Sequence, residues 1–169
     1  RRRTQWMLLL RAIVRYDGTG FHGVQKNQRS DDGTELRTIL SELEQSLWPA
    51  LDQQVTFRVA GRTDAGVSAL GQVVSFDLAS RNDQEEQAAG DEATGEERIH
   101  VHGAAVCASG LAGALNTCLP SDLQIMEIAA VPRGFDAVRD CKWKRYRYQL
   151  PSCQPEPGDG RDDDDDDDD

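Results

Sequence analysis

The sequence lacks the residue patterns that mark metal centres and membrane spans. Its four cysteines form no Cys-X-X-Cys pair, and its three histidines are not spaced like zinc ligands. No apolar run approaches the roughly 20 residues that a membrane-crossing helix needs. We therefore expect no metal site, no membrane span, and reduced thiols in an intracellular protein. The compartment stays open between cytoplasm, nucleus and organelle.

The excess of acidic residues is confined to two segments. The chain carries 19 basic and 30 acidic residues, a net charge of −11. Residues 162–169 are eight consecutive aspartates, and residues 83–97 hold seven more acids. Without these segments 15 acids face 19 bases, a net charge of +4. The low overall pI therefore does not argue against an RNA partner.

The same two segments are expected to lie outside the folded domain. Residues 80–98 have no apolar periodicity, which predicts a disordered insertion. Residues 151–169 predict a disordered acidic tail or the start of an acidic insertion. The folded domain is then expected over residues 1–150. The chain begins at Arg1 rather than methionine and stops in the aspartate run, which favours a fragment of a longer protein.

The remaining segments predict alternating strands and helices. Apolar and β-branched residues predict strands at residues 7–15, 55–61, 72–78, 123–131 and 142–150. An apolar helical face ended by Pro49, and a run of small residues ended by Pro120, predict helices at residues 33–51 and 103–119. The first six elements match a ferredoxin-like (RRM-like) α+β fold, an antiparallel sheet with helices on one face. Its other face would be free to bind RNA.

Three glycines after the first predicted strand, Gly18, Gly20 and Gly23, reproduce the GxGxxG pattern of dinucleotide sites. That pattern indicates a nucleotide site only if a helix begins inside it. Here a polar loop follows, and the predicted helix begins too late to point its N-terminus at a phosphate. We therefore expect no nucleotide cofactor.

The segment AGRTDAGVSALGQVVSF, residues 60–76, places Asp64 on a tight connection between two predicted strands. Gly61 and Gly66 flank it, and glycine permits positive φ and close approach of a ligand. Taken alone, an Asp-Ala-Gly triplet favours an aspartate that only caps a turn. The residues around this triplet are therefore needed to distinguish a structural role of Asp64 from a chemical one.

The longer pattern GRTDAGVxAxGQVV resembles the signature of the tRNA pseudouridine synthase A family. Three further motifs of that family have counterparts in the same order: YDGT at residues 16–19 with Gly23 and Gln25, LNTCLPSD at residues 115–122, and FDAVRDCKWKRYRY at residues 135–148. Together the four motifs cover nearly all of residues 11–150. The resemblance implies a pseudouridine synthase fold and isomerase activity on tRNA uridines, with the anticodon stem-loop region as the expected target.

The resemblance also implies roles for single residues. It places Asp64 at the catalytic aspartate and Tyr146 at the active-site tyrosine. It further implies a homodimer and a second lobe that completes the cleft. Isomerising uridine moves the C1′ bond from N1 to C5 with nothing gained or lost, so we expect no cofactor. One ionised carboxylate near the sugar, acting as nucleophile or base, is what the reaction needs.

Other residues have two interpretations each. Arg62 either favours the charged form of Asp64 and contacts a phosphate, or is an exposed structural arginine. Tyr146 either stacks on the flipped uridine or packs on a sheet face with Tyr148. The basic residues of the last predicted strand either bind RNA phosphates or form a solvated face; they are Lys142, Lys144, Arg145 and Arg147.

Three positions depart from the family pattern. Val24 replaces a tryptophan and is expected to loosen the first loop. Ser68 replaces a common histidine, and Val138 occupies an arginine position, although Arg139 is adjacent. The alternative to an enzyme is a non-catalytic RNA-binding remnant of one, which would bind RNA with strong salt dependence and form no product.

Overall fold

The computed structural model describes residues 7–26, 29–79 and 98–150. The predicted insertion and acidic tail therefore lie outside the described residues, apart from Arg98. That residue begins a strand, β4 (Arg98–Val101), rather than ending an insertion.

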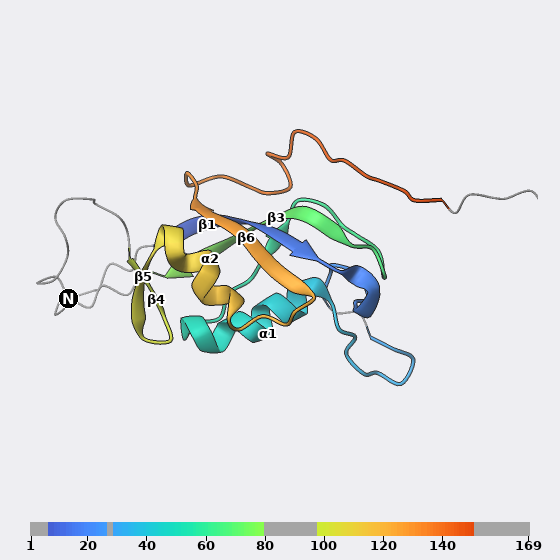
Figure 1. The fold of residues 1–169 in the computed structure, drawn as a ribbon, viewed down its shortest axis with the longest axis horizontal. Helices are drawn as coiled ribbons and strands as arrows, with labels where there is room; N and C mark the ends of the chain where they lie inside the picture. The colour runs from blue at the N-terminus through green and yellow to red at the C-terminus, as the bar shows by residue number, and fades with distance from the viewer. Residues whose placement is uncertain (1–6, 27–28, 80–97, 151–169) are drawn as a thin grey trace, which may run out of the picture.

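The described chain is an α+β fold built on a four-stranded antiparallel sheet (Figure 1). The elements follow in the order β1 (Met7–Tyr16), η1 (Gly18–Gly20), α1 (Ile39–Leu51), β2 (Arg58–Val59), β3 (Ala69–Ala79), β4, β5 (Ala104–Cys107), α2 (Ala108–Asn116) and β6 (Leu123–Ala130). The large sheet has the order β2-β3-β1-β6, and β4 and β5 form a separate two-stranded hairpin. The predicted strands at residues 7–15, 72–78 and 123–131 are confirmed, with small changes at their ends.

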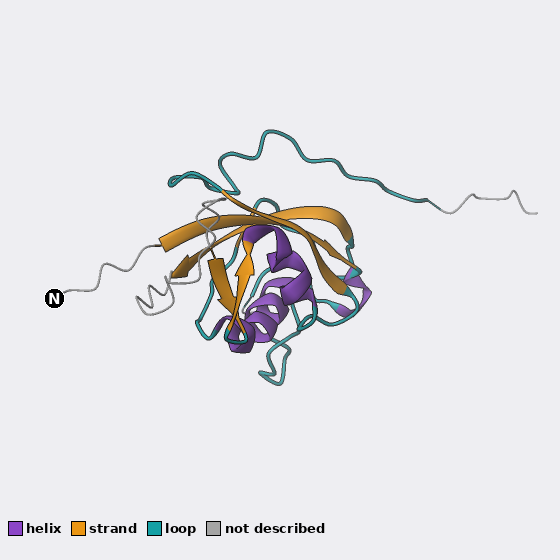
Figure 2. Cartoon of the chain, turned by 60° about the vertical axis from the view of Figure 1, so that its left-hand side comes forward, coloured by secondary structure: helices purple, strands orange, loops and turns teal. Residues whose placement is uncertain are grey.

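Both helices lie on one side of the large sheet (Figure 2). Alternation along β1 places Leu10, Ala12 and Val14 on that side, and each is at most 1% exposed. Leu43 and Leu47 of α1, which are fully buried, belong to the same core. The sheet thus carries a single apolar core on its helix side, with polar connections at its ends.

Helix α1 begins six residues later than the predicted start at residue 33. Thr38 has extended backbone angles and caps the helix, because its side chain accepts a hydrogen bond from the Ser41 N–H. The Ser41 hydroxyl in turn accepts from the Thr38 N–H at 3.0 Å. Pro49 lies inside the last turn instead of ending the helix, which continues to Leu51.

The predicted helix over residues 103–119 is wrong in its first part. Residues 98–107 form the β4–β5 hairpin, closed by His102 and Gly103 with φ of 50° and 79°. Two successive positive φ values are typical of a two-residue hairpin turn. Small residues suit a tight hairpin as well as a helix, so composition alone did not separate the two. Helix α2 occupies only Ala108–Asn116.

Strand β2 is shorter than the predicted strand at residues 55–61. Val55 and Phe57 are buried as the alternation predicts, but only Arg58 and Val59 pair with β3. The Phe57 N–H donates instead to Oε1 of Glu44 on α1 at 3.2 Å. The Glu44 side chain therefore accepts the hydrogen bond that a neighbouring strand would otherwise accept.

The predicted strand at residues 142–150 is wrong, because this segment has no regular secondary structure. Its side chains are exposed: Trp143 is 75% exposed and Tyr148 is 84% exposed. A strand needs a neighbour to supply its hydrogen bonds, and the alternating residue pattern did not reveal that this segment has none within the described sheet. The sheet-packing interpretation of Tyr146, which is 58% exposed, is wrong for the same reason.

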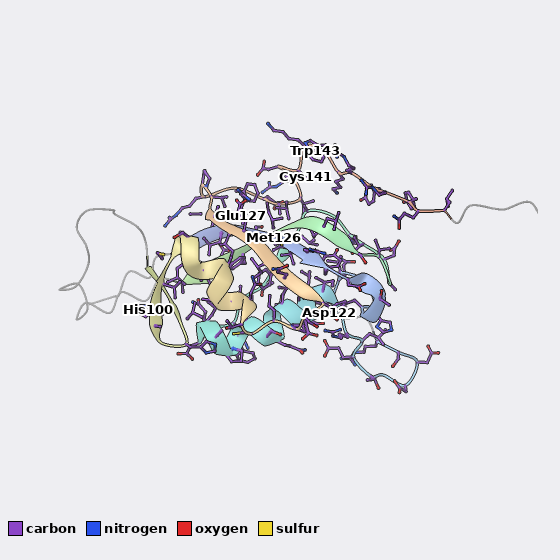
Figure 3. All side chains as sticks on the ribbon, viewed as in Figure 1. His100, Asp122, Met126, Glu127, Cys141 and Trp143 are labelled. Carbon is purple, nitrogen blue, oxygen red and sulfur yellow. The ribbon has the colours of Figure 1, made fainter. Side chains whose placement is uncertain are left out.

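The sheet face opposite the helices is covered in part. The chain after β6 runs across that side in Figure 1, and Figure 3 places Cys141 and Trp143 on it. Ser75 of β3 points to this side and is 0% exposed, and Ala137 of the covering segment is 2% exposed. The expectation of a wholly free face for RNA is therefore wrong at Ser75, which is buried on that face.

Candidate active site

Asp64 begins an exposed tight turn between β2 and β3. The carbonyl of Asp64 accepts from the Val67 N–H at 3.2 Å, and Gly66 has φ of 77°. Glycine at this position of a turn is typical of type II geometry, so the expected positive φ at Gly66 is confirmed. Within the described residues, the Asp64 carboxylate has no hydrogen bond or ion pair and is exposed to solvent. It is available to an incoming ligand.

The chain before the turn is held at Thr63. The Tyr16 hydroxyl, at the end of β1, lies 2.8 Å from Oγ1 of Thr63. The Val24 N–H donates to the Thr63 carbonyl at 3.1 Å. Val24 is fully buried, and its own carbonyl accepts from the Leu40 N–H at the start of α1.

The chain after the turn is held against the same loop. The Gly66 N–H donates to the Phe21 carbonyl at 3.1 Å. The Ser68 hydroxyl accepts from the Gly18 N–H at 3.0 Å and donates to the Asp17 carboxylate at 3.4 Å. Both sides of Asp64 are thus tied to residues 16–24.

The glycines of the GxGxxG pattern allow this close contact. A Cβ on Gly18 would lie 2.1 Å from the Val67 carbonyl oxygen, and one on Gly23 would lie 2.9 Å from that of Thr63. Gly23 also has φ of 88°, which a side chain would strain. Gly18 and Gly23 therefore allow the backbone of this loop to pack against the Asp64 turn.

An arginine holds residues 16–24 to the rest of the fold. The Arg37 guanidinium donates to both oxygens of Asp122, at 2.7 and 3.1 Å, and to Glu42 at 2.6 Å. It also stacks over the Phe21 ring, 4.1 Å from the centroid. Figure 3 places Asp122 where β6 begins. Residues 16–24, which hold the Asp64 turn, are thereby connected to α1 and to the loop between α2 and β6.

Two charged groups of this support have shifted pKa values. The hydrogen bonds from the Thr19 hydroxyl and N–H to Asp17 hold the pKa of that carboxyl below its usual value. The hydrogen bonds to Asp122, more than the contact with Glu42, raise the pKa of Arg37 above its ordinary value. Both groups are therefore charged at neutral pH, and their hydrogen bonds are charge-assisted.

Of the other predicted site residues, Arg62 lies two positions before Asp64, and Tyr146 lies on the segment that follows β6. Arg62 is exposed and forms no ion pair with Asp64. The Lys144 side chain passes Gly61, where a Cβ would lie 3.2 Å from its Nζ, so Gly61 leaves room for a cation three residues before Asp64. Tyr146 follows two residues later on the same segment. Arg139 pairs with Asp136 at 3.6 Å.

Neither a metal centre nor a membrane-crossing helix is present in the described part of the chain. There, no three His, Cys, Asp or Glu side chains are grouped so as to hold a metal ion. The helices within those ranges are too short or too polar to cross a membrane.

Comparison with known proteins decides the relationship. No family model matches the chain. The chain is 34% identical over 141 residues to tRNA pseudouridine synthase A of Corynebacterium glutamicum, covering 83% of this chain and 42% of that protein. Proteins of the same name from Pseudothermotoga lettingae and Streptococcus mutans are 32% and 30% identical over 143 and 151 residues.

The chain is thus similar to three proteins named tRNA pseudouridine synthase A. The match covers 85% and 89% of this chain for the second and third proteins, but only 46% and 49% of those proteins. The chain thus spans less than half the length of these three relatives.

The sequence pattern did not reveal which residues support the Asp64 turn. Tyr16 and Asp122 lie in segments that resemble family motifs, yet nothing in their spacing shows that Tyr16 contacts Thr63 or that Asp122 binds Arg37. Arg37 lies in no such segment, and its three partners are separated from it by up to 85 positions. Only the fold brings these groups together.

Proposed function

We propose that the chain is the Asp64-bearing part of a tRNA pseudouridine synthase. The observation that carries the proposal is the exposed Asp64 carboxylate on a turn fixed from both sides, in a relative of this family. We further propose that the sheet is of the ferredoxin-like type, which its strand order and antiparallel pairing support. The described fold then serves as a rigid platform for one carboxylate.

The proposed reaction isomerises a tRNA uridine, in the anticodon stem-loop region, to pseudouridine. The N1–C1′ bond breaks, the base turns over, and C5 bonds to C1′. The C5 hydrogen is released as a proton, and N1 takes up a proton. The Asp64 carboxylate acts at the sugar or base as nucleophile or base. Atoms and electrons balance within the nucleotide, so the step requires no oxidant or reductant. The uridine must leave its stack to reach Asp64.

Two further residues have proposed binding roles. Arg62, two residues before Asp64 and free of ion pairs with described residues, is available to a backbone phosphate of the target. Tyr146 is more than half exposed and is proposed to stack on the flipped base. The passage of Lys144 over Gly61 supports this, because it brings the Tyr146 segment close to the start of the turn.

The proposed partners are tRNA and a second copy of the complete protein. The relatives are more than twice as long as the matched region, and we propose that their remaining length supplies the other wall of the cleft. We propose that the segment at residues 142–148, with Lys142, Lys144, Arg145 and Arg147, binds RNA phosphates. Replacing any one of these basic side chains by alanine should reduce the salt slope of binding by about one.

The test is tritium release from tRNA labelled at uridine C5, because bond formation at C5 displaces that hydrogen. Asp64→Ala should abolish release while leaving the Kd for tRNA within about threefold, since Asp64 does not supply phosphate contacts. Asp31→Ala removes an exposed carboxylate from another loop and should leave release unchanged. Normal release by Asp64→Ala would contradict the proposal.

The second candidate is an RNA-binding module without catalysis. The exposed aromatic and basic residues at 142–148 favour it, because they need no cleft to bind single-stranded RNA. It predicts salt-dependent RNA affinity with no tritium release from the unaltered chain. The same assay therefore separates the two candidates.

A further inference from the structure

We infer that Tyr16 is a positioning residue for the Asp64 carboxylate and acts through Thr63. This inference rests on the proposed role of Asp64 and names the group that orients it. Tyr16 is the last residue of β1 and is 3% exposed, so its ring is fixed in the core. Its hydroxyl lies 2.8 Å from Oγ1 of Thr63, the residue directly before Asp64.

An irregularity in the sheet creates the need for this contact. Val14 pairs with Gln72, whereas Tyr16 pairs with Ala69, so β3 has one more residue than β1 over this stretch. An extra residue disrupts the ladder and bends the strand that contains it. The chain leading back to Asp64 therefore departs from β1, and the Tyr16 side chain bridges the gap.

The bond to Tyr16 adds a second direction of restraint at Thr63. The carbonyl of Thr63 already accepts from the Val24 N–H at 3.1 Å. A residue held by one hydrogen bond can still rotate about it, whereas bonds at its main chain and side chain together fix its orientation. Because Asp64 follows directly, the orientation of Thr63 sets the direction of the carboxylate. Displacements of about 1 Å at a reacting group can cost roughly a hundredfold in rate.

A structural role for Tyr16 alone makes a different prediction. The buried ring packs in the core, and phenylalanine would preserve that packing while removing only the hydroxyl. If Tyr16 acted only as a core residue, Tyr16→Phe would leave the turn and the reaction unchanged. If it positions Thr63, the change is confined to residues 63–67.

The experiment measures amide hydrogen exchange by NMR in the full chain. Tyr16→Phe should speed exchange about fivefold at the Gly66 and Val67 N–H groups, as expected for loss of one hydrogen bond. Exchange at Val74, in the middle of β3, should not change. Tyr148→Phe removes the same atom from an 84% exposed side chain and is the matched control. Equal exchange in the two variants, or faster exchange at Val74 as well, would overturn the inference.

Substitutions at Thr63 supply the partner test. Thr63→Val removes the hydroxyl and should reproduce the Tyr16→Phe exchange, while Thr63→Ser keeps it and should restore the slow exchange of the unaltered chain. In tritium release, Tyr16→Phe should lower kcat about tenfold with KM unchanged, since positioning acts on the reacting state. If the unaltered chain releases no tritium, the proposed function fails while the exchange data still decide the role of Tyr16.

Discussion

Replacing Gly18 with alanine should displace the Asp64 turn. The added Cβ would lie 2.1 Å from the Val67 carbonyl oxygen and 2.3 Å from its carbon, both backbone atoms. Reaching an ordinary contact of 3.4 Å requires the Val67 backbone to retreat by about 1.3 Å. Overpacking of this kind typically costs about 1–3 kcal/mol of unfolding free energy. A shift of this size next to Asp64 should lower kcat/KM roughly a hundredfold.

The matched control is Gly20→Ala in the same 3-10 turn. Its Cβ would meet only side-chain ends, Arg37 Nη1 at 3.3 Å and Asp122 Oδ2 at 3.8 Å. Alanine also lowers the entropy of the unfolded chain, so stability should stay level or rise by up to about 1 kcal/mol. Urea unfolding and tritium release of both variants check the prediction. If the Gly18 variant matched the Gly20 variant in both assays, the contact between the two loops would not hold the turn.

Two further predictions concern the scaffold around the site. Thr38→Ala removes the buried cap of α1 and should lower the free energy of unfolding, measured in urea, by about 1–2 kcal/mol. The control is Thr56→Ala, which changes an exposed threonine outside any helix and should stay within about 0.5 kcal/mol of the unaltered chain. Equal effects of the two substitutions would show that the cap contributes nothing. Ser75→Ala removes a buried hydroxyl that has no hydrogen-bond partner among the described residues, so the free energy of unfolding should rise by about 1 kcal/mol in the same assay. A clear decrease in that free energy would indicate that the hydroxyl has a partner.

The sequence predicted the elements that are governed by local pattern. Strands β1, β3 and β6 and helix α1 each present apolar residues at the spacing of one buried face, and each exists. The β4–β5 hairpin was missed because its turn is made by His102 and Gly103, and His-Gly is not among the Asn-Gly, Asp-Gly and Gly-Gly pairs typical of such turns. The prediction of a strand at residues 142–150 was wrong for another reason, because an alternating pattern does not show whether a neighbouring strand is present.

The position of the candidate site was predictable from the sequence, but the contacts that support it were not. Flanking glycines and the family resemblance placed Asp64 on a tight connection, and the structure has a turn there with positive φ at Gly66. The residues that support that turn come from distant parts of the chain, as the contact between Tyr16 and Thr63 illustrates. Such contacts follow from strand register and helix packing, which a single sequence does not display.

The tie between Arg37 and Asp122 bears on the order in which the protein folds. The two residues are 85 positions apart, and Tyr16 and Thr63 are 47 apart, so the Asp64 turn is stabilised by contacts of high sequence separation. Contacts of this kind form only after long loops have closed, which is slow and entropically costly. A nascent or partly unfolded chain would display the GRTDAG segment without its support. We therefore expect the Asp64 geometry to appear late and to disappear together with the whole domain during unfolding.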